Sequence, residues 1–206
     1  MQPATEHGAA AVTARRRDVA RAGHVGDVGR ARAGLSDPAP AVRSTALGAL
    51  DRLGDLADAE LADGLSDPDP AVRRRAAELA ATRPEVDLLP ALDDPDPSVV
   101  EMAAYAMGER AETDAVQPLS HLSDAADGHD DPLCREAAVA ALGAIGDPSG
   151  LHAVLAALDD KPAIRRRAAV ALAAFEGPEV EAALRRCLDD RDWQVRQVAE
   201  DLLAVD

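Results

Sequence analysis

The sequence predicts an all-α fold, a right-handed α-solenoid of about six to seven two-helix repeats. One observation is a short motif that recurs along the chain, most clearly as DPAPAVRSTALGAL (37–50) and DPDPAVRRRAAELA (67–80). Another is the composition, because apolar residues make up 47% of the chain and nearly half of them are alanine, with one Phe, one Trp and one Tyr. Such small residues suit thin buried layers between closely stacked helices better than one wide core.

The repeat period becomes visible when the copies are aligned on one step, in which an apolar residue is usually followed by arginine. The steps are Val42-Arg43, Val72-Arg73, Val99-Val100, Cys134-Arg135, Ile164-Arg165 and Val195-Arg196. Their intervals of 30, 27, 35, 30 and 31 residues are typical of a solenoid. A poorer seventh copy precedes them, since RAGHVGDV (21–28) matches ALGAIGDP (141–148) in its Gly-x-Val/Ile-Gly-Asp pattern.

Each copy contains the signals of a helix start. Asp69 is placed to accept a hydrogen bond from the free amides of the first turn, and Pro70 takes the first helical position, where its missing N–H costs nothing. Asp96-Pro97 and Asp131-Pro132 repeat the arrangement. We therefore expect a helix to begin at each pair.

The residues after each start predict one buried face and then a turn. Spacings of four, four and three place Ile164, Ala168, Leu172 and Phe175 on a shared face. Gly or Pro follows, at Gly54-Asp55, Gly146-Asp147-Pro148 and Gly177-Pro178, and a shorter helix comes next, with Leu151, Val154, Leu155 and Leu158 on one side. About thirteen helices would account for the chain.

We expect residues 1–206 to form a single solenoid. Its parts are a basic N-terminal cap with the degenerate first repeat (1–34), repeats (35–122), an acidic insertion loop (123–131), and repeats with a C-terminal cap (132–206). Residues 1–34 contain six arginines (Arg15, Arg16, Arg17, Arg21, Arg30 and Arg32) against Glu6, Asp18 and Asp27, which gives +3, whereas residues 35–206 carry −19. This segment is either a docking arm for an acidic partner or a capping helix that neutralises the neighbouring acidic repeat.

The wording of the motif resembles a known family. The pattern D-P-x-x-x-V-R-x-x-A-A-x-A-L-G-x-[IL]-G-D, clearest at 131–147 and 67–80, is similar to the short HEAT-like repeats of the phycobilisome-lyase type. The resemblance covers nearly the whole chain and implies the solenoid fold. It leaves the function open, because this scaffold serves bilin lyases, metal-dependent hydroxylases, DNA glycosylases and adaptors.

Charged residues recur at fixed places around the aligned step. Five residues before it stand Asp37, Asp67, Asp94, Asp159 and Asp190, and one residue after the apolar position stand Arg43, Arg73, Arg135, Arg165 and Arg196. A catalytic pair is needed once, whereas a scaffold needs the same contact in every unit. We therefore interpret these residues as a structural ladder of Asp–Arg contacts along the stack.

The sequence gives little support to metal chemistry, and we expect no cofactor. Resemblance to the HEAT-like hydroxylases implies several His-Glu dipeptides, but none occurs here, and the histidines (His7, His24, His121, His129 and His152) are scattered. The loop SDAADGHDD (123–131) holds Asp124, Asp127, His129, Asp130 and Asp131, without the alternating Asp spacing and distal Glu of an EF-hand loop. We interpret it as a solvated acidic loop, with adventitious cation binding as the alternative.

Nucleic-acid and bilin binding remain alternatives. A nucleic-acid site favours a basic groove with stacking aromatic residues, whereas Tyr105 and Trp193 are single and far apart in sequence. Resemblance to bilin lyases implies an extended tetrapyrrole held on the concave face, where the same shortage of aromatic residues applies. A net charge of −16 also repels phosphate backbones.

The reading we favour is a non-enzymatic scaffold that binds another protein on its concave face. Positions after the aligned arginine point away from the stack, and we single out Arg74, Arg75, Glu101, Met102, Tyr105, Arg166 and Arg167 as partner-binding residues. The copy at 94–107 differs most, since it replaces the ladder arginine with Val100 and adds Met102, Tyr105 and Met107. Met and Tyr are enriched in interface cores, although Met107 replaces a Leu and fits the core.

Composition also indicates the setting. Asp outnumbers Glu by 26 to 12 and Arg outnumbers Lys by 21 to 1, which is typical of salt-loving archaea or of a GC-rich genome. In the first case the resemblance extends to haloarchaeal adaptors of taxis and motility signalling. Without a long apolar segment or a signal-like start, we expect a cytoplasmic protein. Cys134 and Cys187 stand at apolar positions two repeats apart, which predicts buried thiols and no disulfide.

Overall fold

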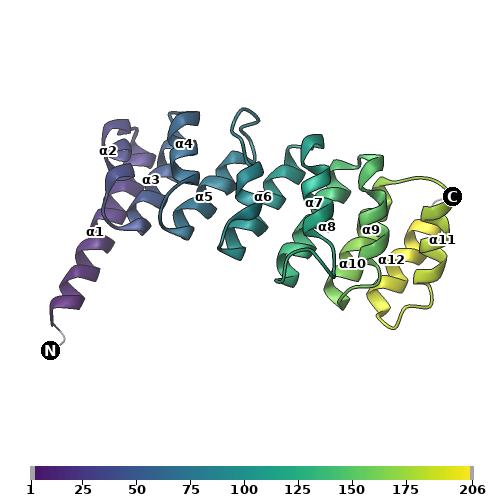
Figure 1. Cartoon of the computed structure of the whole chain (residues 1–206). Helices are drawn as coiled ribbons and strands as arrows, with labels where there is room; N and C mark the ends of the chain where they lie inside the picture. The colour runs from purple at the N-terminus through teal and green to yellow at the C-terminus, as the bar shows by residue number, and fades with distance from the viewer. Residues whose placement is uncertain (1–2, 205–206) are drawn as a thin grey trace. The chain divides into compact units, whose positions relative to one another are not determined.

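The computed structural model describes residues 3–204, with side chains described from Gly8 onwards. In this part of the chain it contains twelve α-helices, five short 3₁₀ segments and no strand (Figure 1). The chain divides into two compact units, unit 1 (Met1–Asp87) and unit 2 (Leu88–Asp206). The predicted all-α solenoid is confirmed, and the expected number of about thirteen helices is close to the twelve observed.

Unit 1 is built on three long helices. Its helices are α1 (Pro3–Val25), α2 (Val28–Ala33), α3 (Pro40–Leu53), α4 (Asp58–Leu65) and α5 (Pro70–Ala80). Helix α3 packs between α1 and α5, while α2 lies against α3 and α4 against α5. The turn between α1 and α2 falls at Gly26-Asp27, within the segment whose sequence matches residues 141–148.

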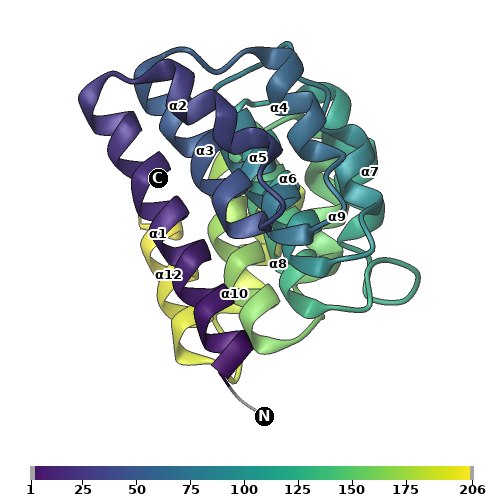
Figure 2. The same ribbon diagram turned by 90° about the vertical axis from the view of Figure 1, so that its left-hand side faces the viewer.

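Unit 2 has two rows of helices. Its α-helices are α6 (Pro97–Glu109), α7 (Val116–Leu122), α8 (Pro132–Ile145), α9 (Leu151–Ala157), α10 (Pro162–Ala171), α11 (Pro178–Cys187) and α12 (Trp193–Leu203), and its 3₁₀ segments are Leu89–Asp93, Thr113–Ala115, Pro148–Gly150 and Leu172–Ala174. Helices α6, α8, α10 and α12 pack successively against one another, and α7 and α9 lie against the other side of this row (Figures 1 and 2). The row of α6, α8, α10 and α12 therefore has one face toward α7 and α9 and one open face.

The predicted helix starts are confirmed. The Oδ1 atoms of Asp69, Asp96 and Asp131 accept hydrogen bonds of 3.0, 3.0 and 2.9 Å from the backbone N–H groups two residues later. Each of the three helices begins with proline, which has no N–H to leave unpaired at this position. Sequence and local geometry therefore agree at the entry of α5, α6 and α8.

The helices approach one another closely at glycine–alanine contacts. A Cβ atom added at Gly108 of α6 would lie 2.9 Å from Ala141 Cα of α8, and one at Gly143 of α8 would lie 2.6 Å from Ala171 Cβ of α10. Gly23 of α1 has the same relation to Ala49 of α3. Real Cβ atoms do not approach so closely, so these stacks depend on glycine. The alanine-rich composition follows from this spacing.

The predicted apolar face of α10 is buried. Ile164, Ala168, Leu172 and Phe175 all contribute to the core of unit 2, although the last two follow the α-helix in a 3₁₀ turn and its cap. Met107 is also fully buried, as its replacement of a Leu predicts. The thiols of Cys134 and Cys187 are buried and free, and burial raises the pKa of Cys134 to about 11.

Candidate partner-binding groove

The recurring arginines join neighbouring repeats. Arg43 of α3 donates from Nη2 and Nε to the Asp67 carboxylate at 2.6 and 2.7 Å, and from Nη1 to the Asp37 carbonyl at 2.9 Å. Arg165 of α10 makes the same pair of contacts, with the Asp190 carboxylate at 3.0 Å and the Asp160 carbonyl at 3.1 Å. Each guanidinium thus fastens its own loop to the carboxylate of the next repeat.

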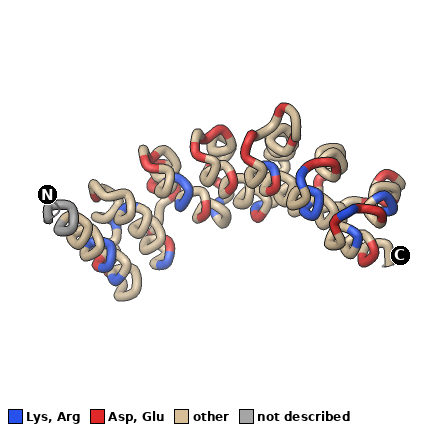
Figure 3. The backbone as a smooth tube through the Cα atoms, turned by 90° about the horizontal axis from the view of Figure 1, so that it is seen from below, with Lys and Arg blue, Asp and Glu red and all other residues tan. Residues whose placement is uncertain are grey.

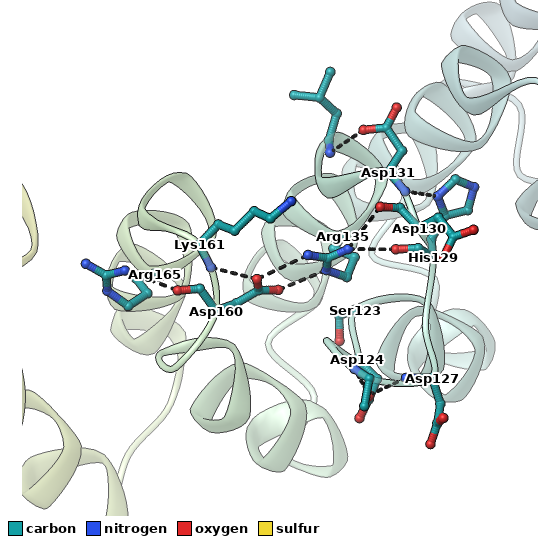
Figure 4. Close-up of polar contacts among 12 residues, drawn as sticks. Ser123, Asp124, Asp127, His129, Asp130, Asp131, Arg135, Asp160, Lys161 and Arg165 are labelled. Atoms are coloured by element: carbon teal, nitrogen blue, oxygen red, sulfur yellow. Dashed lines mark hydrogen bonds and ion pairs between the residues drawn. The ribbon is translucent and has the colours of Figure 1, made fainter.

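The rung from Arg135 corrects one assignment. Its Nε and Nη2 donate to Asp160 at 2.9 and 3.1 Å, not to Asp159, which is exposed (Figure 4). The reason lies in the loop before α10. Asp160 is one residue nearer the helix than Asp159, and its carboxylate also accepts a hydrogen bond from the backbone N–H of Lys161. Counting five residues back from the apolar position therefore misses the residue used here.

The ladder carboxylates are stabilised in their charged form. Burial opposes the ionisation of Asp67 and Asp160, but hydrogen bonds from Arg43 and Arg135 outweigh it, so the pKa of each carboxyl is lowered. The pKa of Asp190 is lowered chiefly by the hydrogen bond from Arg165. These aspartates are therefore structural anions that hold the repeats together.

The remaining predicted ladder residues make related contacts. Arg73 Nη1 donates to the Asp67 carbonyl at 2.9 Å, and Arg196 Nη1 donates to the Asp190 carbonyl at 2.7 Å. Asp94 Oδ1 accepts from the backbone N–H of Asp96 at 2.9 Å. Each of these residues therefore orders the loop of its own repeat.

An unpredicted rung stands at the start of unit 1. Arg15 Nε donates to Asp37 Oδ2 at 2.7 Å, while Arg30 pairs with Asp18 and Arg32 with Glu60. Arg16, Arg17 and Arg21 are exposed, and Figure 3 shows the basic segments near the N-terminus. Half of the six N-terminal arginines thus neutralise acidic residues within the unit, as a capping helix would.

The acidic insertion loop is ordered by its own hydrogen bonds. Asp124 Oδ1 accepts from the N–H groups of Ala126 at 2.7 Å and Asp127 at 2.9 Å, and His129 Nδ1 accepts from the N–H of Asp131 at 3.0 Å (Figure 4). The carbonyls of His129 and Asp130 accept from Arg135. Among the described residues, no group of three or more His, Cys, Asp or Glu side chains is arranged to hold a metal ion.

A groove opens on the free face of α6 and α8 in unit 2. Its cavity of about 560 Å³ is lined by residues of three helices: Glu101, Met102, Tyr105, Gly108 and Glu109 of α6, Leu133, Glu136, Ala137, Ala140, Ala141 and Ala144 of α8, and Arg167 of α10. Tyr105 and Leu133 are 51% and 57% exposed, whereas most large apolar side chains are buried. The groove therefore has an alanine floor and apolar side chains at its edges.

The apolar surface continues between α8 and α10. A second cavity, of about 370 Å³, shares Ala140, Ala144 and Arg167 with the first and adds the exposed Val170. Arg167 Nη2 lies 3.4 Å from Glu136 Oε1, so this ion pair crosses from α10 to α8 between the two cavities. Together the two cavities form what we call the α6–α10 groove.

The predicted partner-binding residues fall into two groups, five in unit 2 and two in unit 1. Four of them, Glu101, Met102, Tyr105 and Arg167, line the α6–α10 groove. Arg166 lines a small adjoining cavity of about 330 Å³, where its Nε lies 3.5 Å from Asp192 Oδ2.

Arg74 and Arg75 belong to α5 of unit 1. Arg74 is exposed, whereas the Arg75 guanidinium lies against Gly48 of α3 and its Nη1 is 2.8 Å from Glu78 Oε2. Arg75 is therefore engaged within unit 1 and is less available to a partner than the sequence implies.

Several groove residues escaped the sequence reasoning. The predicted set covers the two positions after the aligned arginine and adds Tyr105 because its repeat departs from the others, so it lacks Leu133, Ala140, Ala144 and Val170. A periodic signal existed, since Tyr105, Ala140 and Val170 each lie six residues after the aligned apolar position. One further turn of helix would have identified the same face.

No helix among the described residues is long and apolar enough to cross a bilayer.

Comparison with known proteins identifies the repeat. A family model of HEAT repeats matches residues 59–128 and 119–204, which together span more than half of the chain. No curated protein sequence matches significantly. The likenesses to solved structures are below 25% identity, and those with a TM-score above 0.5 show the fold alone.

YibA of Escherichia coli matches with a TM-score of 0.64 and 18% identity, over 90% of this chain and 72% of that one. An engineered protein matches with a TM-score of 0.61 and 19% identity, over 86% and 95%. Human deoxyhypusine hydroxylase in complex with glycerol has a TM-score of 0.49 and 23% identity, over 90% and 75%.

Proposed function

The chain belongs to the HEAT repeat family, and from this premise we propose that it is a non-enzymatic scaffold whose α6–α10 groove binds a segment of a partner protein. The observation that carries the proposal is the open apolar face of unit 2, where Tyr105, Leu133 and Val170 are each about half exposed above a floor of alanines. Contiguous apolar surface with a polar rim is characteristic of interaction sites.

The energetics favour occupation of the groove. Fully burying a large apolar side chain contributes about 1.5–3 kcal/mol, so covering the exposed halves of Tyr105, Leu133 and Val170 contributes about 1 kcal/mol each. The alanine floor leaves room for larger side chains from the partner. Tyrosine is also among the residue types that dominate binding energy when they are desolvated.

The character of the groove supports binding over catalysis. Its carboxylates, Glu101, Glu109 and Glu136, stand on the rim, where Glu101 and Glu109 are exposed and Glu136 is partly exposed. An active site needs titratable groups that converge on one reacting atom in a concave pocket. The same carboxylates repel phosphates, which disfavours the nucleic-acid alternative, and Tyr105 offers only one aromatic ring to a bilin.

A narrower form of the proposal concerns the setting. The excess of Asp over Glu and of Arg over Lys supports a salt-loving archaeon, in which this protein would be a cytoplasmic adaptor of taxis or motility signalling. Its midpoint of thermal unfolding should then rise by several degrees when KCl increases from low to molar concentration. A chain fully folded without salt, with a midpoint independent of KCl, contradicts this setting and leaves the groove proposal unaffected.

Site-specific photo-crosslinking tests the groove. A benzoylphenylalanine placed at position 105, in cells of the organism that makes the protein, should give a discrete adduct with a partner. The matched control is position 78, six residues after the aligned Val72 just as Tyr105 is six residues after Val99. The adduct should be absent there and should be lost when Ala144→Trp fills the groove. Equal adducts at both positions, or an adduct that survives Ala144→Trp, would contradict the proposal.

A further inference from the structure

We infer that the segment bound in the α6–α10 groove presents a Lys or Arg side chain beside its apolar residues, and that Tyr105, flanked by Glu101 and Glu109, receives this cation. The inference rests on the proposed function and specifies the chemistry of the partner. It names the residues that distinguish one apolar segment from another.

The geometry of α6 places a ring between two carboxylates. Glu101, Tyr105 and Glu109 are spaced by four residues, so they lie along one stripe of the helix, and all three line the same cavity. Tyr105 is 51% exposed and both glutamates are exposed. A cation over the ring face is therefore within reach of a carboxylate on either side.

Neither glutamate is neutralised by an ion pair to a described residue, in contrast to the ladder carboxylates of Asp67, Asp160 and Asp190, each of which pairs with an arginine. Across the groove Glu136 has Arg167 as its counter-ion, at 3.4 Å, with the arginine side chain 46% exposed. The lining thus contains three glutamates and one arginine, which leaves a net charge of −2. The α6 side of the groove is the acidic one.

This distribution selects one class of occupant. A cation over an exposed aromatic ring contributes about 0.5–1 kcal/mol, and each exposed carboxylate pair adds about 0.2–1 kcal/mol. An acidic segment would place like charges against Glu101 and Glu109, and a purely apolar segment would leave this side unused. The alanine floor between Leu133 and Ala144 accepts the apolar side chains that adjoin the cation.

The test uses designed helical peptides as probes. Three peptides of equal length share one leucine face and carry Lys, Gln or Glu at the positions bordering it, and fluorescence anisotropy measures their affinity for the full chain. The Lys peptide should bind about tenfold more tightly than the Gln peptide, and the Glu peptide should bind most weakly. The preference should decline as salt is added.

Variants of the full chain identify the residues responsible. The double variant Glu101→Gln/Glu109→Gln should reduce the preference for the Lys peptide over the Gln peptide to less than about threefold. Tyr105→Leu keeps an apolar side chain and removes the ring face, so it should weaken the Lys peptide more than the Gln peptide. Glu78→Gln is the matched control, because Glu78 takes the position in α5 that Tyr105 takes in α6, and it should leave the affinities of the three peptides unchanged. Circular dichroism checks that each variant is folded.

The outcomes separate this inference from the proposed function. If the Lys peptide does not bind, or if the double variant keeps the full preference for Lys, the inference is wrong. If Ala144→Trp abolishes the binding of all three peptides while the double variant changes nothing, the groove is retained and its cation site is rejected. Binding that withstands Ala144→Trp rejects the groove itself. A dimer of the chain alone that Tyr105→Leu disrupts assigns the face to a second copy and overturns the inference.

Discussion

Helices α5 and α6 begin with nearly the same sequence, yet their exposed faces differ. In both, the residues at the aligned step and four positions later are buried: Val72 and Ala76 in α5, Val99 and Ala103 in α6. Three and six positions after the step, α5 carries the ion pair of Arg75 and Glu78. At the same two positions α6 carries Met102 and Tyr105, which line the groove.

The two helices show that one framework supports two kinds of surface. In unit 1 the Arg75 guanidinium lies over Gly48 of α3, so it covers the floor between α3 and α5. In unit 2 the corresponding floor between α6 and α8 stays open, with Ala137 and Ala140 at its base. Buried positions therefore build the stack, while the exposed positions decide whether the floor between two helices is covered by a side chain or stays open to a partner.

The largest expected effect comes from breaking the shared framework. Asp160→Ala leaves the Arg135 guanidinium, 7% exposed, without its carboxylate, and removing one partner of a buried pair costs about 3–5 kcal/mol. Chemical denaturation should show this loss in the free energy of unfolding. The neighbouring Asp159→Ala is the control, because Asp159 is exposed. If Asp159→Ala lowered the free energy of unfolding as much as Asp160→Ala, the assignment of the Arg135 contact to Asp160 would be contradicted.

Glycine contacts between helices come next. Gly143→Leu forces a side chain into the space of Ala171 on α10, and such overpacking costs about 1–3 kcal/mol. Gly29→Ala is the comparison, since the nearest neighbour of its new Cβ is 3.8 Å away, so it should be neutral or slightly stabilising. Thermal unfolding monitors both, and a neutral Gly143→Leu would show that α8 and α10 are not held at this spacing.

Acid should weaken the ladder in a predictable direction. The pKa values of Asp67, Asp160 and Asp190 are lowered in the folded chain, so their contribution is complete above the unfolded pKa of about 3.9 and is lost as the pH falls through the folded values. The free energy of unfolding should therefore decline below about pH 4. Asp160→Asn should flatten this decline and Asp159→Asn should not. If the free energy of unfolding declined identically at low pH in both variants, Asp160 would not be one of the carboxylates that stabilise the fold through a lowered pKa.

The smallest effect on stability is expected at the exposed positions that differ between α5 and α6. Tyr105→Ala and Glu78→Gln remove surface groups, so each should change the free energy of unfolding by less than about 0.5 kcal/mol. Denaturation curves measured side by side check this. A loss above about 2 kcal/mol for Tyr105→Ala would place the ring in the core rather than on a binding face.

The fold was accessible from the sequence because its signals are local and repeated. Asp69 with Pro70 predicts a helix start from adjacent residues, and Gly146-Asp147 predicts a turn, which the structure builds with a φ of 66° at Gly146. The choice of Asp160 over Asp159 depended on loop geometry that counting residues does not contain. Repetition therefore made the scaffold predictable and left its exceptions to the structure.

The candidate groove was only partly accessible. Tyr105 and Met102 drew attention because they interrupt the repeat, whereas alanines such as Ala140 and Ala144 look like ordinary repeat residues in the sequence. Their role as a floor arises from the distance between α6 and α8, which Gly108 sets by its contact with Ala141. Such a property belongs to two helices together, and reading one helix at a time does not reveal it.

Hydroxyl-radical footprinting with the Lys peptide tests most directly whether the receptive face is that of α6 and α8. The oxidation of Tyr105, Met102 and Leu133 should fall on binding, while that of Trp193, 64% exposed on α12 and outside the groove, should stay constant. Protection of Trp193 alone, or unchanged oxidation of Tyr105 at saturating peptide, would contradict the account.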